Sequence, residues 1–260
     1  MFDFHVHSSV SYDSGSSAES MSKAAAAIGL KEICFTDHFD NHTDPSEPPY
    51  TFDMADYRKA YEELEIPGLG IRKGLEFGLT EWNTDEFRKW ESKYPFDFII
   101  GSVHEVAGKD PYWGGYWTGD LEADFRRYLE HILLCVQIHE GFDVLGHLTF
   151  VAKCAGNTSG KGLSFEKYRD VTDAIMQELV RKDMGMEINT SSFDKTGGFM
   201  PSMAHIRRFK ELGGKIITVG SDAHDPGRVG QHIPLALERL KDIFGYVCTF
   251  QNRQPVFHKL

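Results

Sequence analysis

Two histidines separated by one residue lie near the start of the chain and are the first candidates for chemistry. His5 and His7 belong to the apolar stretch 1–7. Because side chains at positions i and i+2 of a β-strand point to the same face, both imidazoles can offer a ring nitrogen to one point in space. A single His-x-His pair is a weak signal, since such pairs also occur on ordinary strands. The interpretation as a metal site therefore depends on further ligands.

Further imidazole and carboxylate side chains recur at the ends of other β-rich stretches. They are Asp37, His38, Glu76, His104, His147, Glu187, Asp222 and His224, with Asn189 beside them. A mixture of ring nitrogens and carboxylate oxygens without cysteine is typical of Zn²⁺, Fe²⁺ or Mn²⁺ sites. Burying so many of these groups is costly unless cations pair with them. The set is too large for one ion and large enough for three.

These side chains must be positioned by an alternation of short β-rich runs and longer amphipathic runs. The predicted strands cover residues 1–7, 32–36, 70–78, 96–102, 142–146, 185–189 and 215–220. The predicted helices cover residues 17–29, 54–64, 84–92, 121–139, 165–182, 202–212 and 233–240, and residues 246–250 form a closing strand or a packed tail. Such alternation predicts parallel strands with crossover helices, in a (β/α) barrel or a doubly wound sheet.

The positions of the polar residues distinguish these two folds. They follow the C-terminal ends of successive strands, where a barrel gathers side chains from all its strands. An open sheet brings only a few strand ends to its switch point. We therefore expect a closed or nearly closed barrel. The 260 residues contain no Pro-, Gly- or Ser-rich linker, which predicts a single domain covering 1–260.

Composition narrows the class of protein further. The chain is 41% hydrophobic and 26% charged, without an apolar run of about 18 residues or a signal-peptide pattern, so we expect a cytoplasmic protein with no membrane partner. The net charge of −11 argues against a nucleic-acid partner. The four cysteines are far apart and form no CxxC pair, which predicts reduced thiols in or near the core.

Seven short strings along the chain carry a family resemblance. They are His5-Val6-His7, Thr36-Asp37-His38, Gly74-Leu75-Glu76, Gly101-Ser102-Val103-His104, Gly146-His147, Glu187-Ile188-Asn189-Thr190 and Gly220-Ser221-Asp222-Ala223-His224. Together they resemble the PHP (polymerase and histidinol phosphatase) family and, within it, the monofunctional histidinol-phosphate phosphatases. The resemblance runs in the family's order over nearly the whole chain. Its most specific parts are the Gly-Ser-Val-His and Gly-Ser-Asp-Ala-His strings and the downstream Val229-Gly230.

The resemblance implies a distorted (β/α)7 barrel with its active site at the C-terminal rim of the strands and three divalent metal ions, which are Zn, Fe or Mn. The implied ligand sets are His5, His7, Glu76 and Asp222 for one ion, a bridging Glu76 with His104 and His147 for a second, and His38, His224 and Asp13 for a third. A common family pattern has a histidine in the loop where this chain has Asp13. An alternative role for Asp13 is to cap the helix that follows.

The implied activity is hydrolysis of L-histidinol phosphate, a small phosphomonoester, to L-histidinol and inorganic phosphate in histidine biosynthesis. Divalent ions about 3.5–4 Å apart can bind a bridging hydroxide for in-line attack and stabilise the charge of the transition state. The phosphate also needs cationic side chains, and the candidates are Lys153, Lys195 and Arg228. The candidates for proton transfer to the leaving group are Asp222 and His224, with His42 and His232 as further possibilities.

The remaining histidines are expected to be structural, and two segments are expected to contribute to substrate binding. The remaining histidines on predicted helices or in the tail are expected to be structural, namely His131, His139, His205 and His258. The insert 40–50 and the aromatic run 112–117 follow ligand-bearing strands and are expected to form a lid or a pocket wall. An aromatic wall would suit a substrate that carries an imidazole.

Three other functions stay open on the sequence. A PHP phosphoesterase acting on another small phosphomonoester, a nucleotide or nucleic-acid 3′ ends would share the metal site. A metal-dependent amidohydrolase also uses a His-x-His barrel, although such sites usually hold two ions. A non-enzymatic scaffold would keep its metals in closed coordination and lose no turnover on chelation.

Overall fold

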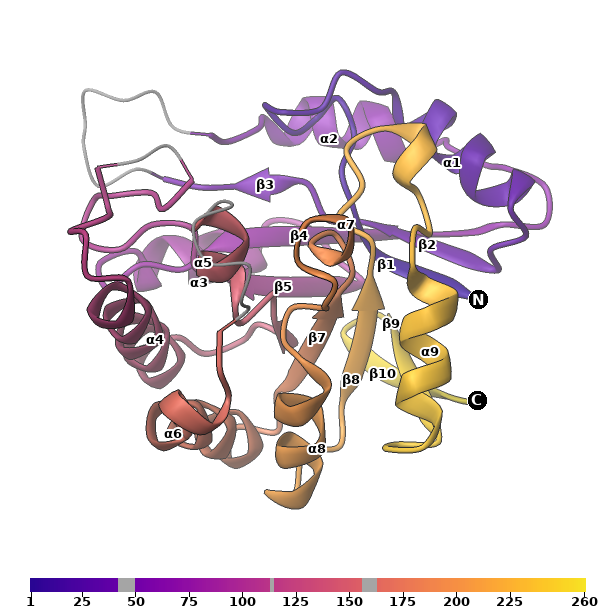
Figure 1. Cartoon of the computed structure of the whole chain (residues 1–260). Helices are drawn as coiled ribbons and strands as arrows, with labels where there is room; N and C mark the ends of the chain where they lie inside the picture. The colour runs from indigo at the N-terminus through magenta and orange to yellow at the C-terminus, as the bar shows by residue number, and fades with distance from the viewer. Residues whose placement is uncertain (42–49, 113–114, 156–162) are drawn as a thin grey trace.

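The computed structural model describes residues 1–41, 50–112, 115–155 and 163–260 (Figure 1). The strands are β1 (Phe2–Val6), β2 (Glu32–Phe35), β3 (His38–Phe39), β4 (Gly70–Gly78), β5 (Phe98–Ser102), β6 (Val144–Leu145), β7 (Gly185–Asn189), β8 (Ile217–Gly220), β9 (Tyr246–Gln251) and β10 (Gln254–Lys259). The helices are α1 (Ala18–Ala27), α2 (Met54–Tyr61), α3 (Thr84–Glu91), α4 (Leu121–Ile138), α5 (Phe150–Cys154), α6 (Arg169–Arg181), α7 (Phe193–Thr196), α8 (Met203–Glu211) and α9 (Ile233–Lys241). Short 3₁₀ helices cover Glu166–Tyr168 and Pro226–Arg228.

Seven parallel strands form the central sheet in the order β1-β2-β4-β5-β6-β7-β8, and β3 pairs with β4 beside this path. The sheet curves until its last strand meets its first at the C-terminal rim. There the amide of His7 donates to the carbonyl of Ala223 over 2.9 Å, and the amide of Asp222 donates to the carbonyl of His5 over 2.8 Å. The sheet is therefore a nearly closed barrel with helices outside it (Figure 1), and the expected (β/α)7 architecture is confirmed.

A buried carboxylate at the start of β1 holds this seam together. Asp3 is fully buried and accepts hydrogen bonds from the amides of Ser221, at 2.9 Å, and Gly230, at 2.8 Å. Burial raises the pKa of Asp3 to about 6, although these hydrogen bonds oppose the rise. The loop that follows β8, which contains Asp222 and His224, is thereby fixed to the first strand.

Local sequence signals set most element boundaries. The Ser17 hydroxyl accepts from the amide of Ser20 and caps the start of α1, and Gly29 takes a positive φ of 77° just after this helix ends. Strands β4 and β7 have the bounds that the sequence predicts. The predicted helix over 165–182 begins instead as a 3₁₀ turn and continues as α6. The short elements β3, α5 and α7 were not predicted, because two to five residues are too few to show a hydrophobic period.

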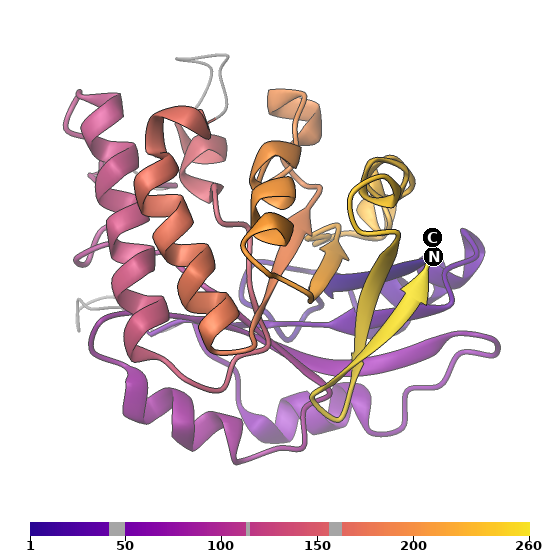
Figure 2. The ribbon, with the colours of Figure 1, turned by 90° about the horizontal axis from the view of Figure 1, so that it is seen from below.

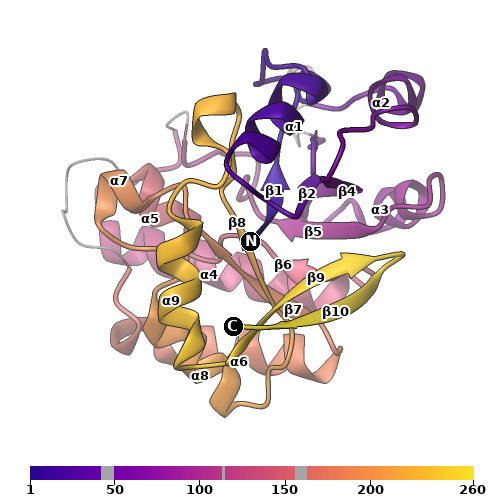
Figure 3. The same cartoon turned by 90° about the vertical axis from the view of Figure 1, so that its right-hand side faces the viewer.

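The end of the chain lies outside the barrel. Residues 246–250, predicted as a closing strand or a packed tail, lie in β9, which pairs antiparallel with β10 in a separate hairpin and does not join the central sheet (Figure 3). This hairpin crosses the end of the barrel opposite the strand C-termini (Figure 2). Phe250 of β9 packs there against Phe98 with ring centroids 4.8 Å apart, in a cluster with the barrel residues Phe4, Cys34, Ile100 and Val144.

The four cysteines are free thiols, and three of them, Cys34, Cys135 and Cys248, are buried as expected. Cys154 is partly buried. Among the helices of the described ranges, none has both the length and the apolarity needed to cross a membrane.

Candidate metal centre

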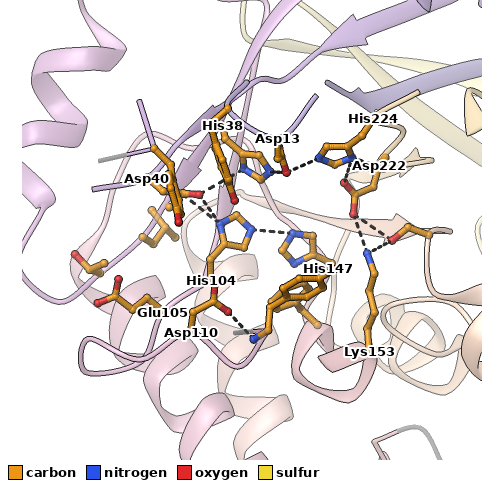
Figure 4. A pocket seen from close by; sticks show the side chains of 18 of the residues that line it. Asp13, His38, Asp40, His104, Glu105, Asp110, His147, Lys153, Asp222 and His224 are labelled. Carbon is orange, nitrogen blue, oxygen red and sulfur yellow. Dashed lines mark hydrogen bonds and ion pairs between the residues drawn. The ribbon is translucent and has the colours of Figure 1, made fainter. Parts of the chain in front are cut away.

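The C-terminal ends of the strands bring the ligand candidates together in one largely buried cluster, and Figure 4 shows those of its members that line a pocket. His5 lies in β1, Glu76 in β4 and His38 in β3, and the remaining candidates follow the ends of strands. The register explains this convergence, because β3 pairs His38 with Glu76 across neighbouring strands. Parallel strands in such a barrel place residues that are distant in sequence at the same height of the rim.

Glu76 is the fully buried carboxylate at the centre of the cluster. Its Oε2 atom lies 3.1 Å from His5 Nε2, 3.5 Å from His7 Nε2 and 3.1 Å from His38 Nδ1. The rings of His5 in β1, of His7 just after β1 and of His38 in β3 therefore face one carboxylate oxygen.

The other oxygen of Glu76 faces a second pair of rings. Its Oε1 atom lies 2.9 Å from His147 Nε2 and 3.3 Å from His104 Nε2. The Ser102 hydroxyl donates to the same oxygen over 2.6 Å, which fixes the orientation of the carboxylate. Glu76 thus has the geometry of a bridge between two groups of histidines.

A third group forms around Asp13. Its Oδ2 atom lies 3.0 Å from His224 Nε2 and 3.6 Å from His38 Nε2. The helix cap of α1 is Ser17, so the structure gives Asp13 no capping role. Asp222 Oδ1 completes the first group at 3.4 Å from His7 Nε2 and 3.8 Å from His5 Nε2.

Each of four sets of side chains offers ligand atoms that lie within 4.8 Å of one another. The sets are His5, His7 and Asp222; Glu76, His104 and His147; His7, Asp13, His38 and His224; and His38, Asp40 and His104. The first three correspond to the predicted ligand groups, except that the first set lacks Glu76 and the third also contains His7. Asp40 belongs to the fourth set and was not predicted as a ligand.

Several buried polar atoms in this cluster have no hydrogen-bond partner among the described residues. They are His5 Nε2, His7 Nε2, His38 Nδ1, His224 Nε2 and Glu76 Oε2. Leaving buried polar atoms without partners is costly, so the fold would not retain five of them at one place without compensation. Divalent cations that accept nitrogen and oxygen ligands supply that compensation, and the donor set fits them.

The electrostatics of the cluster favour the ligand forms of Glu76, Asp13 and His7. Burial alone would raise the pKa of Glu76, but the surrounding His5, His38 and His104 rings hold this pKa well below its ordinary value. Burial also opposes ionisation of Asp13, yet the neighbouring His224 ring, whose Nε2 lies 3.0 Å from Asp13 Oδ2, lowers the pKa of this carboxyl to about 2. Burial and the neighbouring His224 and His38 rings hold the pKa of His7 well below its ordinary value. Ionised carboxylates and a neutral imidazole are the forms that bind metals.

Glu187 and Asp40 orient histidines of the cluster from behind. Glu187 Oε1 lies 2.6 Å from His5 Nδ1, and its Oε2 accepts from the amide of His147 over 2.9 Å. Asp40 Oδ2 lies 3.1 Å from His104 Nδ1. A carboxylate on one ring nitrogen directs the other nitrogen toward a metal. The sequence placed Glu187 at a strand end but gave no sign of its partner, because His5 lies 182 residues away.

Two glycines leave the space that this arrangement needs. A Cβ atom at Gly220 would lie 2.2 Å from the Cβ of His5, and one at Gly78 would lie 2.0 Å from Asp40 Oδ1. Neither contact is possible without displacing the side chain concerned. The glycine of the Gly-Ser-Asp-Ala-His string therefore allows β8 to pass close to His5.

A pocket of about 410 Å³ opens above the cluster. Asp13, His38, His104, His147, Asp222 and His224 line it, together with the predicted phosphate-binding residues Lys153, Lys195 and Arg228. His5, His7 and Glu76 do not line this pocket and are fully buried. Lys153 Nζ donates to Ser191 Oγ over 2.8 Å and lies 3.5 Å from Asp222 Oδ2 (Figure 4). Positive charge thus stands directly beside the cluster.

The aromatic side of the pocket differs from the expectation. Tyr12, Tyr50, Tyr112 and Phe150 line the pocket, and the Tyr12 and Tyr50 rings stack with centroids 3.8 Å apart. Of the predicted aromatic run, Tyr112 is part of this wall. Tyr116 is instead buried beneath Arg127, whose guanidinium lies 4.3 Å from the ring centroid. Tyr50 and Tyr112 come from the two segments predicted to form a lid or pocket wall, whereas Tyr12 and Phe150, which begins α5, were not predicted.

The remaining histidines lie away from the four ligand sets. His131, His139, His205 and His258 make contacts with their own surroundings, as expected for structural residues. His232 pairs with Asp194 at 2.7 Å and does not line the pocket. His42, which was a possible proton donor, and most of the predicted lid 40–50 lie outside the described residues.

Comparison with known proteins agrees with this geometry. The family model described as PHP domain matches residues 3–191. A histidinol-phosphatase from Lactococcus lactis subsp. lactis is 34% identical over 229 residues, which cover 85% of this chain and 83% of that protein.

Solved structures extend the comparison. The crystal structure of histidinol phosphate phosphatase from the same organism, complexed with zinc, L-histidinol and phosphate, matches with a TM-score of 0.89 and 32% identity over 98% of each chain. A chain from the crystal structures of YwqE from Bacillus subtilis and CpsB from Streptococcus pneumoniae matches with a TM-score of 0.51 and 20% identity, over 94% of this chain and 88% of that chain, and shows the shared fold alone. The chain therefore belongs to the PHP domain family and, within it, to the histidinol-phosphate phosphatases.

Proposed function

We propose that this chain is a metal-dependent phosphomonoesterase that hydrolyses L-histidinol phosphate to L-histidinol and inorganic phosphate. The observation that carries the reaction class is the group of unpartnered buried atoms around Glu76, beneath a pocket that contains Lys153, Lys195 and Arg228. The substrate is supported by similarity to the Lactococcus lactis protein, whose structure contains L-histidinol and phosphate. One barrel domain over 1–260 and a cytoplasmic location stay predictions.

Three divalent ions are the proposed cofactors, and zinc is the first choice because the similar structure contains it. Their proposed ligands are His5, His7, Glu76 and Asp222 for the first, Glu76, His104 and His147 for the second, and Asp13, His38 and His224 for the third. When bound, such ions activate water as a nucleophile and neutralise charge on the phosphoryl group.

The side chains of the pocket have separate proposed roles around this centre. Lys153, Lys195 and Arg228 bind the phosphate oxygens, since all three line the pocket next to the cluster. Asp222 and His224 relay a proton to the oxygen of the leaving alcohol, because both line the pocket and both belong to the sets of candidate ligands. The Ser191 hydroxyl donates to Asp222 Oδ2 over 3.1 Å. This hydrogen bond keeps the oxygen next to the Lys153 ammonium group, which lies 3.5 Å away.

The rest of the pocket suits the organic part of this substrate. L-Histidinol phosphate carries an amine and an imidazole. Glu105 and Asp110 supply carboxylates to the pocket, and the Tyr12, Tyr50 and Phe150 rings supply aromatic surface. An ammonium group and an aromatic ring therefore find complementary surfaces in the same pocket as the cations and the cluster that would bind the phosphate.

The test is phosphate release from L-histidinol phosphate and from a panel of other phosphomonoesters. The protein is first treated with a chelator, and Zn²⁺, Mn²⁺ or Fe²⁺ is then added back. We expect selective turnover of L-histidinol phosphate that the chelator abolishes and a divalent ion restores. Equal turnover of the whole panel would keep the metal phosphatase but reject the substrate. No turnover with any of the ions would reject the phosphatase.

A further inference from the structure

His7 differs from two other histidines of the cluster in what its second ring nitrogen contacts. His5 Nδ1 faces the Glu187 carboxylate at 2.6 Å, and His104 Nδ1 faces the Asp40 carboxylate at 3.1 Å. His7 Nδ1 instead lies 3.1 Å from the hydroxyl of Ser11. His7 is fully buried and Ser11 is 3% exposed, so water does not replace this contact. A hydroxyl can donate or accept, and its role here needs a separate argument.

The other partners of Ser11 determine that role. A serine hydroxyl has one proton and two acceptor lone pairs. The backbone amide of His38 donates to Ser11 Oγ over 2.9 Å and occupies one lone pair. Ser11 Oγ donates its proton to Asp37 Oδ1 over 3.1 Å. One lone pair then remains for His7, so the proton between the two residues must be on His7 Nδ1.

The Asp37 carboxylate is held as an acceptor by the rest of the network. Its Oδ1 also accepts from the amide of Ser8 over 2.8 Å, and its Oδ2 accepts from the hydroxyl of Tyr61 in α2. Tyr61 in turn shares a 2.6 Å hydrogen bond with Ser8 Oγ, which accepts from the amide of Val10 over 3.2 Å. With Ser8 donating to Tyr61, each hydrogen bond has one consistent direction and Asp37 supplies no proton.

The other ring nitrogen of His7, Nε2, faces the cluster. With the proton on Nδ1, Nε2 carries a free lone pair. This is the atom that lies 3.5 Å from Glu76 Oε2 and 3.4 Å from Asp222 Oδ1 and has no hydrogen-bond partner among the described residues.

We propose that Ser11 is a positioning residue that relays the Asp37 carboxylate to His7 and fixes the tautomer and orientation in which His7 Nε2 can bind a metal ion. The relay does for His7 what the directly contacting carboxylates do for His5 and His104. This inference rests on the proposed metal-dependent function, and its tests do not use turnover.

Zinc affinity of the full-length chain is the first test. We expect Ser11→Ala to weaken the binding of zinc by about 10- to 100-fold, the usual cost of losing an outer partner of a ligand. The measurement is competition for Zn²⁺ with a chromogenic chelator. Ser11→Thr keeps a hydroxyl and is expected to restore most of the affinity. Ser14→Ala is the matched control, because Ser14 Oγ donates to the His224 backbone carbonyl over 2.8 Å and contacts no ring nitrogen in this structure.

Nitrogen NMR of the zinc-loaded protein tests the tautomer itself. In protein labelled with ¹⁵N-histidine, His7 should show a proton on Nδ1 that exchanges slowly with solvent, with its signals identified by their loss in His7→Gln. Ser11→Ala should speed the exchange of this proton, whereas Ser14→Ala should not.

Two results would overturn the proposal. One is a wild-type His7 that carries its proton on Nε2, which needs no Ser11 variant and holds even if Ser11→Ala fails to fold. The other is wild-type zinc affinity in a folded Ser11→Ala protein. Neither result depends on which phosphomonoester the protein hydrolyses, so failure of the relay and failure of the proposed function are distinguishable.

Discussion

At the scale of single residues, Glu187 contacts two candidate metal ligands and does not line the pocket. It is buried, and its two oxygens hold the His5 ring and the amide of His147. We predict that Glu187→Gln lowers turnover by about 10- to 100-fold and releases zinc more readily, because the amide lacks the charge that supports His5 as a ligand. The measurements are steady-state kinetics and metal content after dialysis against a chelator.

The control for this variant is Glu62→Gln. Glu62 is 52% exposed at the end of α2, where it pairs with Arg58. It should change neither turnover nor zinc content. Wild-type turnover and zinc retention in Glu187→Gln would contradict the orienting role.

Lys153 is a cation placed directly beside the cluster and provides a second prediction at this scale. Its ammonium group bonds to Ser191 and stands 3.5 Å from Asp222. We predict that Lys153→Met lowers kcat/KM by about 10- to 100-fold, because a hydrogen bond to a charged group contributes about 1.5–3 kcal/mol. Lys153→Arg should retain part of the activity, since it keeps the charge.

The comparison variant is Lys23→Met in α1. Lys23 is 65% exposed and pairs with Glu19 on the helix surface. Its kcat/KM should equal that of the wild type. A Lys153→Met protein with unchanged kcat/KM would remove Lys153 from the phosphate site.

At the scale of elements, the hairpin of β9 and β10 and the metal centre occupy opposite ends of the barrel. Phe250 of β9 is 2% exposed and packs on Phe98 at the start of β5. We predict that Phe250→Ala lowers the free energy of unfolding by about 3–5 kcal/mol, the usual cost of removing a buried phenylalanine side chain. KM should not change, because the strands between the two ends keep their register. Urea unfolding and steady-state kinetics measure the two effects.

Phe257 on the same hairpin is the matched control. Its side chain is 53% exposed, so Phe257→Ala should change the free energy of unfolding by no more than about 0.5 kcal/mol. If both substitutions destabilised the protein equally, the hairpin would not close the barrel through Phe250.

At the scale of the whole molecule, buried titratable groups make the stability depend on pH. Burial lowers the pKa of His205 in α8 from 6.5 to about 4. The unfolded chain binds this proton more readily, so the stability contributed by the neutral ring is complete above pH 6.5 and is lost as the pH falls toward 4. Between pH 7.5 and 5 the loss is about 2 kcal/mol. We predict that His205→Gln removes this part of the acid sensitivity.

The measurement is the difference in the free energy of urea unfolding between variant and wild type at the two pH values. Excess chelator is present throughout, so that release of metal at acid pH does not contribute. His232→Gln serves as control, because His232 is partly exposed and pairs with Asp194. The same pH dependence in wild type and His205→Gln would show that another group is responsible.

The sequence by itself determined the barrel and most of the candidate metal-binding residues. Local signals were sufficient for this, since alternation of strands and helices, caps such as Ser17 and the rim positions of His5, Glu76 and Asp222 are all visible within a few residues of chain. A parallel barrel then brings the strand ends together whatever the detailed packing. The bounds of strands β4 and β7 follow from these signals, whereas the division of the ligand candidates into three groups came from the family resemblance.

Only the tertiary structure decided which side chains support those ligands. The contact of Glu187 with His5 and that of Asp40 with His104 join residues 182 and 64 positions apart, and no local pattern encodes such a pair. The Ser11 relay also depends on Tyr61, which a separate helix supplies. The ligands could be predicted because strand ends place them, whereas their partners are selected by packing between elements, which becomes defined only when the barrel closes.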